Sequence, residues 1–293
     1  MTNIFKIALR NLLRYKRRTL LTATLVTLGV VFVLVFTAVA GTFKNMMISQ
    51  ITDSMMGHLQ IHRKGYVAAI DTLPLNLGIK QQGYEKIEAL LKQEQGIAAY
   101  SPRIKFGGMF SNFMETTNIR LNGIFPEKEF ATVPLLPERV TSGRKSLQRG
   151  EIMVPELLAR GMNVKVGDTV VIVSTNQSGS VNGKQFLVSA ILESATGPGG
   201  RDGYLHFDDA VELLRMEQPE ISEITVRLKQ FGSLHKLENK LRGQLETQKN
   251  PKGKPVLELH SWEALSPFAK IAKMLDLMTL FIKIMLVSIV LIS

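Results

Sequence analysis

An uncharged stretch dominates the first part of the chain. Residues 19–43 read TLLTATLVTLGVVFVLVFTAVAGTF, between Arg18 and Lys44. A helix of this length, at about 1.5 Å per residue, rises roughly 37 Å and exceeds the ~30 Å hydrocarbon core of a bilayer. The stretch is longer than the apolar region of a signal peptide, which is about 7–15 residues. We therefore predict a permanent transmembrane helix at 19–43.

Apolar residues continue beyond this stretch at helical spacing. Phe43, Met47, Ile51 and Met55 recur every four residues, and Gly57 follows them. Positions four apart lie on one face of a helix, and glycine favours helix ends. The pattern predicts that residues 44–56 form a stalk helix with one apolar stripe.

A second apolar stripe appears near the end of the chain. Phe268, Ile271, Leu275 and Met278 again follow helical spacing, and residues 284–293 are uncharged. Ten uncharged residues are too few to span a bilayer, yet the run is unbroken where the sequence stops. We expect residues 263–293 to form a stalk and the start of a second, truncated transmembrane helix, in a fragment of a longer membrane protein.

The intervening residues 57–262 alternate between strand and helix patterns. Strands at 57–62, 103–113 and 118–124 with a helix at 84–93 predict a mixed sheet with a helix on one face. Close-spaced strands and glycine-containing turns after residue 150 predict a β-rich part. The further predicted elements are strands at 151–154, 184–192, 204–207, 223–228 and 256–260, and helices at 208–216 and 234–248, with Pro155 opening another helix.

Charge indicates how the chain lies in the membrane. Six basic residues and no acid give residues 1–18 a charge of +6 out of the +11 of the whole chain. Basic residues beside a first span remain cytoplasmic, so the N-terminus is expected inside and residues 57–262 outside. Residues 1–18 also fit an amphipathic basic helix on the inner leaflet, whose role is anchoring or contact with a cytoplasmic partner. Nucleic-acid binding is not expected, because the main basic cluster adjoins the bilayer.

No motif for catalysis, metal or cofactor binding stands out. Gly179–Gln185 resembles a P-loop but has three residues between its glycines and glutamine where Ser or Thr must hold magnesium. His58 and His62 lie in a predicted strand, which favours sheet-surface histidines over a metal site. His206, His235 and His260 are not part of a cluster of metal-ligating residues, and no serine has a G-x-S-x-G context. We therefore expect no enzymatic activity in this chain.

The order of parts resembles a known family. ALRNLLRYKRRT (8–19) runs into the apolar stretch, followed by GHLQIHRKGY (57–66), a large external domain and a returning apolar helix. This order is similar to that of the permease subunits of the MacB–LolC–FtsX family of ABC transporters, also called type VII. GHLQIHRKGY looks most like the LolC/LolE-type lipoprotein-release permeases.

The resemblance implies an α+β membrane protein of the bacterial inner membrane. Family members have four transmembrane helices, with stalks that carry a periplasmic α/β porter-like subdomain and an inserted β-rich sabre-like subdomain. Here the porter-like part is expected at 57–137 and 217–262, and the sabre-like part at 138–216. The family acts by mechanotransmission from an ATP-binding subunit, as dimers of identical or different permeases.

The resemblance also suggests two sites. The stalk residues Phe43, Met47, Ile51 and Met55 are candidates for a lipid-accessible cavity that accepts acyl chains, although packing between the two stalks explains the stripe as well. In LolC, the hairpin corresponding to 176–185 carries proline and recruits a periplasmic chaperone. Here it reads NQSGSVNGKQ, which fits a LolE-like role or another substrate equally well. The candidate partner loop comprises Asn176, Gln177, Ser178, Gly179, Gly183 and Gln185.

We thus expect a permease subunit that extrudes or releases a lipoprotein or another hydrophobic substrate. Its expected partners are an ATP-binding subunit, a second permease subunit, membrane lipid, and a periplasmic chaperone or adaptor. Three alternatives remain open. They are MacB-like efflux with an outer-membrane partner, an FtsX-like regulator of cell-wall hydrolases, and a two-span sensor.

Overall fold

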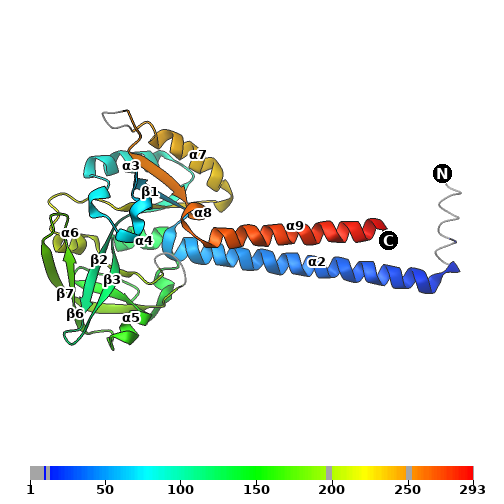
Figure 1. Cartoon of the computed structure of the whole chain (residues 1–293), viewed down its shortest axis with the longest axis horizontal. Coiled ribbons are helices and arrows are strands. Elements are labelled where there is room, and N and C mark those ends of the chain that lie inside the picture. Colours follow the sequence, from blue (N-terminus) through cyan, green and yellow to red (C-terminus); the bar gives the residue numbers. More distant parts are fainter. Residues whose placement is uncertain (1–9, 11–13, 196–199, 249–252, 293) are drawn as a thin grey trace. The chain divides into compact units, whose positions relative to one another are not determined.

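The structure is a computed structural model that describes residues 10, 14–195, 200–248 and 253–292. It divides into two compact units. Figure 1 shows the chain coloured by residue number. The helical unit comprises Met1–Ile48 and Phe268–Ser293, and the α/β unit comprises Ser49–Pro267. The predicted basic helix at 1–18 lies mostly outside the described residues and stays a prediction.

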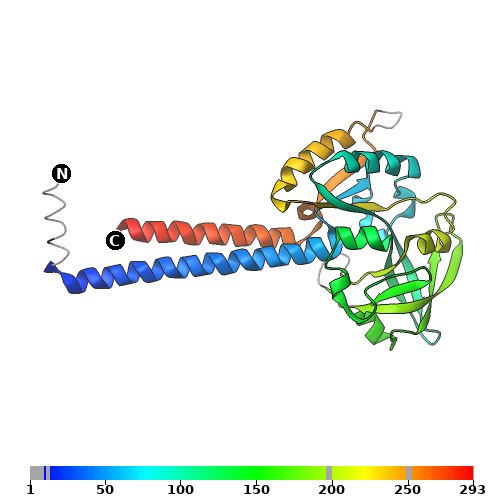
Figure 2. The same ribbon diagram turned by 180° about the vertical axis from the view of Figure 1, so that it is seen from behind.

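The helical unit contains two long helices, α2 (Lys16–Ile51) and α9 (Phe268–Ile292). They run side by side in both views (Figures 1 and 2), and Lys44 Nζ donates to both carboxylate oxygens of Asp276, at 2.6 and 2.7 Å. Many large apolar side chains on both helices are exposed, as on a surface that faces lipid. Among the described residues, one helical stretch, Lys16–Met56, is long and apolar enough to cross a membrane.

The α/β unit is built on one mixed sheet. Its strands follow the order β10-β1-β9-β2-β3-β8-β5-β7-β4, and β6 pairs with both β2 and β7. The pairs β3–β8 and β5–β7 are parallel, which confirms the predicted mixed sheet. The strands are β1 (Leu59–Arg63), β2 (Ile97–Ser111), β3 (Thr116–Ile124), β4 (Val140–Gly143), β5 (Glu151–Pro155), β6 (Thr169–Thr175), β7 (Val181–Leu192), β8 (Gly203–His206), β9 (Glu223–Leu228) and β10 (Leu257–Ser261).

Short amphipathic helices pack their apolar faces inward. In α7 (Leu234–Leu245), leucines spaced three or four apart are all buried, as this spacing predicts. The remaining α-helices are α3 (Gln81–Gln93), α4 (Pro126–Thr132), α5 (Glu156–Gly161), α6 (Phe207–Leu213) and α8 (Trp262–Leu265). The turns of 3-10 helix are η2 (Val67–Thr72), η3 (Leu75–Leu77), η4 (Pro137–Arg139) and η5 (Phe231–Ser233).

The sheet and core continue across the predicted boundary at residue 138. β2 pairs with β6 and β3 pairs with β8, so strands from both predicted subdomains share one sheet. One buried cluster likewise joins Ile124 and Leu136 to Met153 and Tyr204. The division into porter-like and sabre-like parts therefore stays a proposal, since no break in the sheet marks it.

One local prediction about a helix start was wrong. Pro155 ends β5 and serves as the N-cap of α5 instead of opening that helix, because its backbone is extended. The start of α6 is capped by His206, whose Nδ1 accepts a hydrogen bond from the amide of Asp208 at 3.3 Å.

A glycine ends the first helix where it meets the sheet. Gly57 has φ of 69°, and a Cβ there would overlap Thr225 Cγ2 and lie 3.1 Å from Val226 O. We expect Gly57→Ala to lower the unfolding free energy by about 2–4 kcal/mol, from left-handed backbone strain plus overpacking. Gly65→Ala is the matched control, because Gly65 has φ of 92° with no atom within 4 Å of a Cβ. Urea unfolding that shows equal losses for both variants would contradict a steric role for Gly57.

Candidate functional site

The first helix changes its form as it enters the α/β unit. The π-helix η1 (Thr52–Met56) follows α2, and the amide of Gly57 donates to Thr52 O at 2.8 Å. Single π-helical turns are rare and often occur at functional sites. We call residues 49–57 the stalk junction.

Asp53 fastens the stalk junction to the sheet. Its carboxylate accepts a hydrogen bond from Ser49 Oγ at 2.7 Å and lies 3.4 Å from Arg227 Nη2 on β9. His58 Nε2 is 3.6 Å away, and the amide of Leu135 donates to the main-chain oxygen of Asp53 at 2.8 Å. The turn is thereby tied to β9 and to the loop before η4.

Arg139 holds the same turn from the other side. This buried arginine on η4 donates to the main-chain oxygen of Ser54 at 3.4 Å and to that of Gly200 at 2.8 Å. Its Nε and Nη2 also donate to Glu193 O, at 3.1 and 2.8 Å. Because a buried guanidinium is costly to leave unsatisfied, these carbonyls fix the position of η1 relative to β7.

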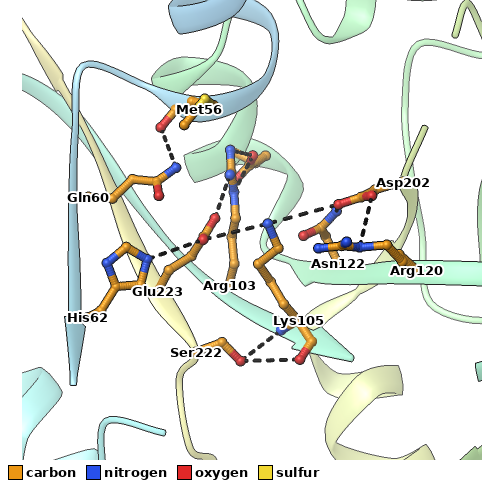
Figure 3. A network of polar contacts seen from close by, with 11 residues as sticks. Met56, Gln60, His62, Arg103, Lys105, Arg120, Asn122, Asp202, Ser222 and Glu223 are labelled. Atoms are coloured by element: carbon orange, nitrogen blue, oxygen red, sulfur yellow. Dashed lines mark hydrogen bonds and ion pairs between the residues drawn. The ribbon is translucent and has the colours of Figure 1, made fainter. Parts of the chain in front are cut away.

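A network of charged side chains lies next to the stalk junction (Figure 3). Arg103 on β2 donates through Nε and Nη2 to Glu129 Oε1, at 2.9 and 2.5 Å, and through Nη1 to Glu223 Oε1, at 2.7 Å. All three side chains are at most 3% exposed. Gln60 lines the same small cavity as Arg103 and Glu223, and its Nε2 donates to Met56 O of η1 at 2.9 Å (Figure 3).

The network continues across β2 and β3 to the loop before β8. Glu223 Oε2 lies 3.6 Å from Lys105 Nζ, which is 3.9 Å from Asp202 (Figure 3). Asn122 donates to Asp202 at 3.1 Å, and Arg120 Nε lies 3.7 Å from it. Three cations thus balance the carboxylates of Glu129, Glu223 and Asp202, which is how buried charges become tolerable.

Electrostatic pairing favours the charged forms of Glu223 and Arg103. Burial raises the pKa of Glu223, but the charges of Lys105 and Arg103 and the adjacent His62, whose Nε2 lies 3.6 Å from Oε2, outweigh burial and hold that pKa well below its ordinary value. Burial lowers the pKa of Arg103, yet Glu129 and Glu223 more than reverse this effect. A cavity of about 40 Å³ beside these groups is large enough for about one water. The arrangement therefore suits rigid positioning.

The predicted stalk stripe falls into two environments. Phe43 is 49% exposed and Met47 is partly buried, whereas Ile51 and Met55 are 3% and 2% exposed. The π-turn is one reason, because it shifts the helical register between Ile51 and Met55. In this chain Ile51 and Met55 are therefore core residues, and the prediction of one continuous lipid-accessible stripe does not hold for them.

The candidate partner loop is shorter than expected. Gly183 and Gln185 lie within β7, opposite Val173 and Val171 of β6, so the hairpin tip spans only 176–180. Gln177 Nε2 donates to Leu75 O at 2.6 Å and to Glu220 Oε2 at 3.2 Å.

The tip is also ordered by its own residues. Asn176 Oδ1 accepts from the amides of Ser178 and Ser180, and Gly179 supplies a φ of 84°. The tip therefore folds back onto its own unit, and its role in partner binding stays a proposal.

The histidines of β1 are buried, contrary to the expectation of sheet-surface positions. His58 Nδ1 accepts from the amide of Leu228 at 3.0 Å. The ring of His62 is buried next to those of Tyr66 and His260, with centroid distances of 5.3 and 5.9 Å. We expected His260 to stand alone, but it neighbours His62. Within the part of the chain that the structure describes, no group of three His, Asp or Glu is placed to hold a metal.

Sequence reasoning missed the charged network. One signal was present, because Arg103 and Lys105 alternate with apolar residues in RIKF and must share one face of a strand. Charges on a face that is otherwise buried indicate pairing. Their partners, however, come from α4, β9 and the loop before β8, which no local pattern connects.

The structure thus defines an α/β domain that follows a long apolar helix, and this helix ends in a π-turn. Comparison with family models assigns residues 19–244 to the MacB-like periplasmic core domain, so the chain belongs to this family. It is accordingly a permease component of a type VII ABC transporter, an inner-membrane protein with a periplasmic domain.

Solved structures with a similar fold include the periplasmic region of MacB from Actinobacillus actinomycetemcomitans, at 15% identity and a TM-score of 0.48, covering 69% of this chain and 87% of that one. The extracellular domain of the noncanonic ABC-type transporter YknZ from Gram-positive bacteria matches at 14% identity and a TM-score of 0.47, covering 70% and 98%. A domain of a permease protein from Porphyromonas gingivalis matches at 14% identity and a TM-score of 0.46, covering 74% and 94%. Comparison with curated proteins gives no match.

Proposed function

We propose that this permease converts ATP hydrolysis by a partner subunit into movement of the α/β unit, and thereby extrudes or releases a lipoprotein or another hydrophobic substrate. One observation carries the proposal. The π-turn that continues α2 is held on the α/β unit through Asp53, Ser54 and Arg139. A helix end held by several bonds transmits tilt or rotation of the helix instead of absorbing it.

The arrangement in the membrane follows from charge and apolar length. The N-terminus is cytoplasmic, because six basic residues precede the first span, and α9 begins a second span. The α/β unit carries the porter-like part at 57–137 and 217–262 and the sabre-like part at 138–216. The permease works with an ATP-binding subunit and a second permease subunit, identical or different. A chaperone or adaptor contact is assigned to residues 176–180.

The exposed part of the stalk stripe is the proposed contact for acyl chains. Phe43 is 49% exposed and Met47 is partly buried, so both offer apolar surface, and methionine adapts well to irregular chains. Ile51 and Met55 are instead assigned to packing within the α/β unit.

Photo-crosslinking tests this proposal in vesicles that contain the full permease, its ATP-binding subunit and an acylated cargo. A photoreactive residue at Phe43 is expected to capture the cargo before ATP is added and to lose it during turnover. The same residue at Ile51, which is 3% exposed, is the matched control and should capture none. ATP hydrolysis without cargo capture at Phe43 or Met47 would refute transport and favour the FtsX-like alternative.

A further inference from the structure

In the helical unit, one basic residue of α9, Lys283, lies opposite an uncharged stretch of α2. Lys44 on α2 holds Asp276 on α9 by two hydrogen bonds, and a Cβ at Gly29 would lie 3.5 Å from Leu286 Cδ1. These contacts place the two helices side by side over this length, as both views show (Figures 1 and 2). Between its two contact positions α2 has no charged residue, but α9 has one, Lys283.

Helical geometry places Lys283 below the ion pair. Seven residues make almost two turns, so Lys283 lies on the same face of α9 as Asp276 and about 10 Å further along the axis. At this level α2 consists of uncharged residues. Lys283 is exposed, and within the described residues it makes no ion pair or hydrogen bond. An ammonium group therefore sits beside the hydrocarbon layer.

The direction of the side chain indicates where this ammonium goes. Side chains on a helix lean toward its N-terminus, which in α9 is the end at Phe268, next to the α/β unit in the chain. Lysine extends its charge along an apolar stem to reach the interface. Lys283 thus reaches toward the headgroups of the leaflet on the side of the α/β unit.

The charge balance calls for one further anion. Asp276 uses both carboxylate oxygens on Lys44, so it does not neutralise Lys283. Lys270 and Lys273 precede Asp276 on α9, with no acidic residue between them, and both are exposed. Apolar neighbours of Lys283, such as Leu280 and Ile284, are 54% and 56% exposed, which opens this face to lipid. A lipid phosphate meets these conditions of charge and depth.

We propose that Lys283 binds the phosphate of an anionic lipid headgroup, with the Lys44–Asp276 pair closing the outer side of the site. The inference rests on the proposed function only in taking α9 as a membrane span. It assigns anionic phospholipid as a bound partner of the helical unit.

Lipid quenching of a local fluorophore tests the proposal on the full chain in vesicles. A Leu280→Trp reporter, one turn from Lys283, is quenched by brominated phosphatidylglycerol or by brominated phosphatidylcholine. We expect the apparent affinity for phosphatidylglycerol to be about fivefold higher, the effect of one lysine near a membrane surface. Lys283→Met should reduce this ratio to about one, and Lys283→Arg should retain it. Lys270→Met, thirteen residues earlier on α9, is the control and should change it little.

Each outcome decides the matter. Equal quenching by both lipids in the parent chain, or an unchanged preference in Lys283→Met, would overturn the site. Release of the anionic lipid by inorganic phosphate would show that the site takes any phosphate, which also overturns it. Failure of both lipids to quench would show that α9 lies outside the bilayer, which contradicts the proposed membrane arrangement as well. The test needs neither the ATP-binding subunit nor cargo, so its failure alone leaves the transport proposal standing.

Discussion

Replacing Arg103 with methionine is expected to lower the unfolding free energy by about 3–5 kcal/mol, because removing one partner leaves buried charges uncompensated. Glu129 and Glu223 would lose their bonds to Arg103, and both are fully buried. Urea unfolding of the full chain in detergent measures this loss. Trp262, the single tryptophan, is buried in the α/β unit and reports its unfolding by fluorescence.

Two further variants isolate the effect of charge. Arg120→Met removes a cation of the same network that is 47% exposed, and it should cost about 1 kcal/mol or less. A triple variant, Arg103→Met with Glu129→Gln and Glu223→Gln, should recover most of the loss, since neutral replacement of buried ion pairs is often tolerated. If Arg103→Met were as stable as the parent chain, the network would not support the fold.

The direction of the pH dependence follows from Glu223. Its pKa in the folded protein lies below the ordinary value, so its contribution to stability is present above that ordinary value and is lost as pH falls through the folded pKa. Without Arg103, burial should let the pKa of Glu223 rise, and protonation would then relieve the unpaired charge. The deficit of Arg103→Met should therefore be largest near neutral pH and shrink in acid.

The helices and strands were largely predictable, because each depends on local pattern. The uncharged stretch at 19–43 lies within α2, and the strand predicted at 223–228 has the bounds of β9. Alternation and helical spacing indicate which face of an element is buried, and both can be read from neighbouring residues in the sequence.

The site was not predictable, because it depends on contacts between distant residues. Arg103 meets Glu223 only through the register of β2 on β9, which pairs residues 120 positions apart. The prediction of one continuous exposed stalk stripe was wrong for a different reason. Spacing by four assumes an unbroken α-helix, whereas Thr52–Met56 forms a π-turn that the surrounding contacts of Asp53 and Arg139 hold in place.

We expect the side-chain contacts of Asp53 in the stalk junction to be required for coupling ATP hydrolysis to transport. Asp53→Ala removes the contacts with Ser49, Arg227 and His58 but keeps the main-chain bond to Leu135, so the α/β unit should still fold. The π-turn would then move without carrying β9 along. We expect the reconstituted complex to hydrolyse ATP at the parent rate while cargo release falls to background.

The ratio of cargo released to ATP hydrolysed measures this coupling. Asp71→Ala is the matched control, because Asp71 is an exposed aspartate on η2 of the same unit, and its ratio should equal that of the parent chain. An unchanged ratio in Asp53→Ala would refute the coupling role of the junction. Loss of ATP hydrolysis together with transport would place the defect in assembly with the ATP-binding subunit, and would contradict that role too. The expected separation of the two activities arises because the junction directly follows the predicted membrane helix in the chain and is bonded to the sheet.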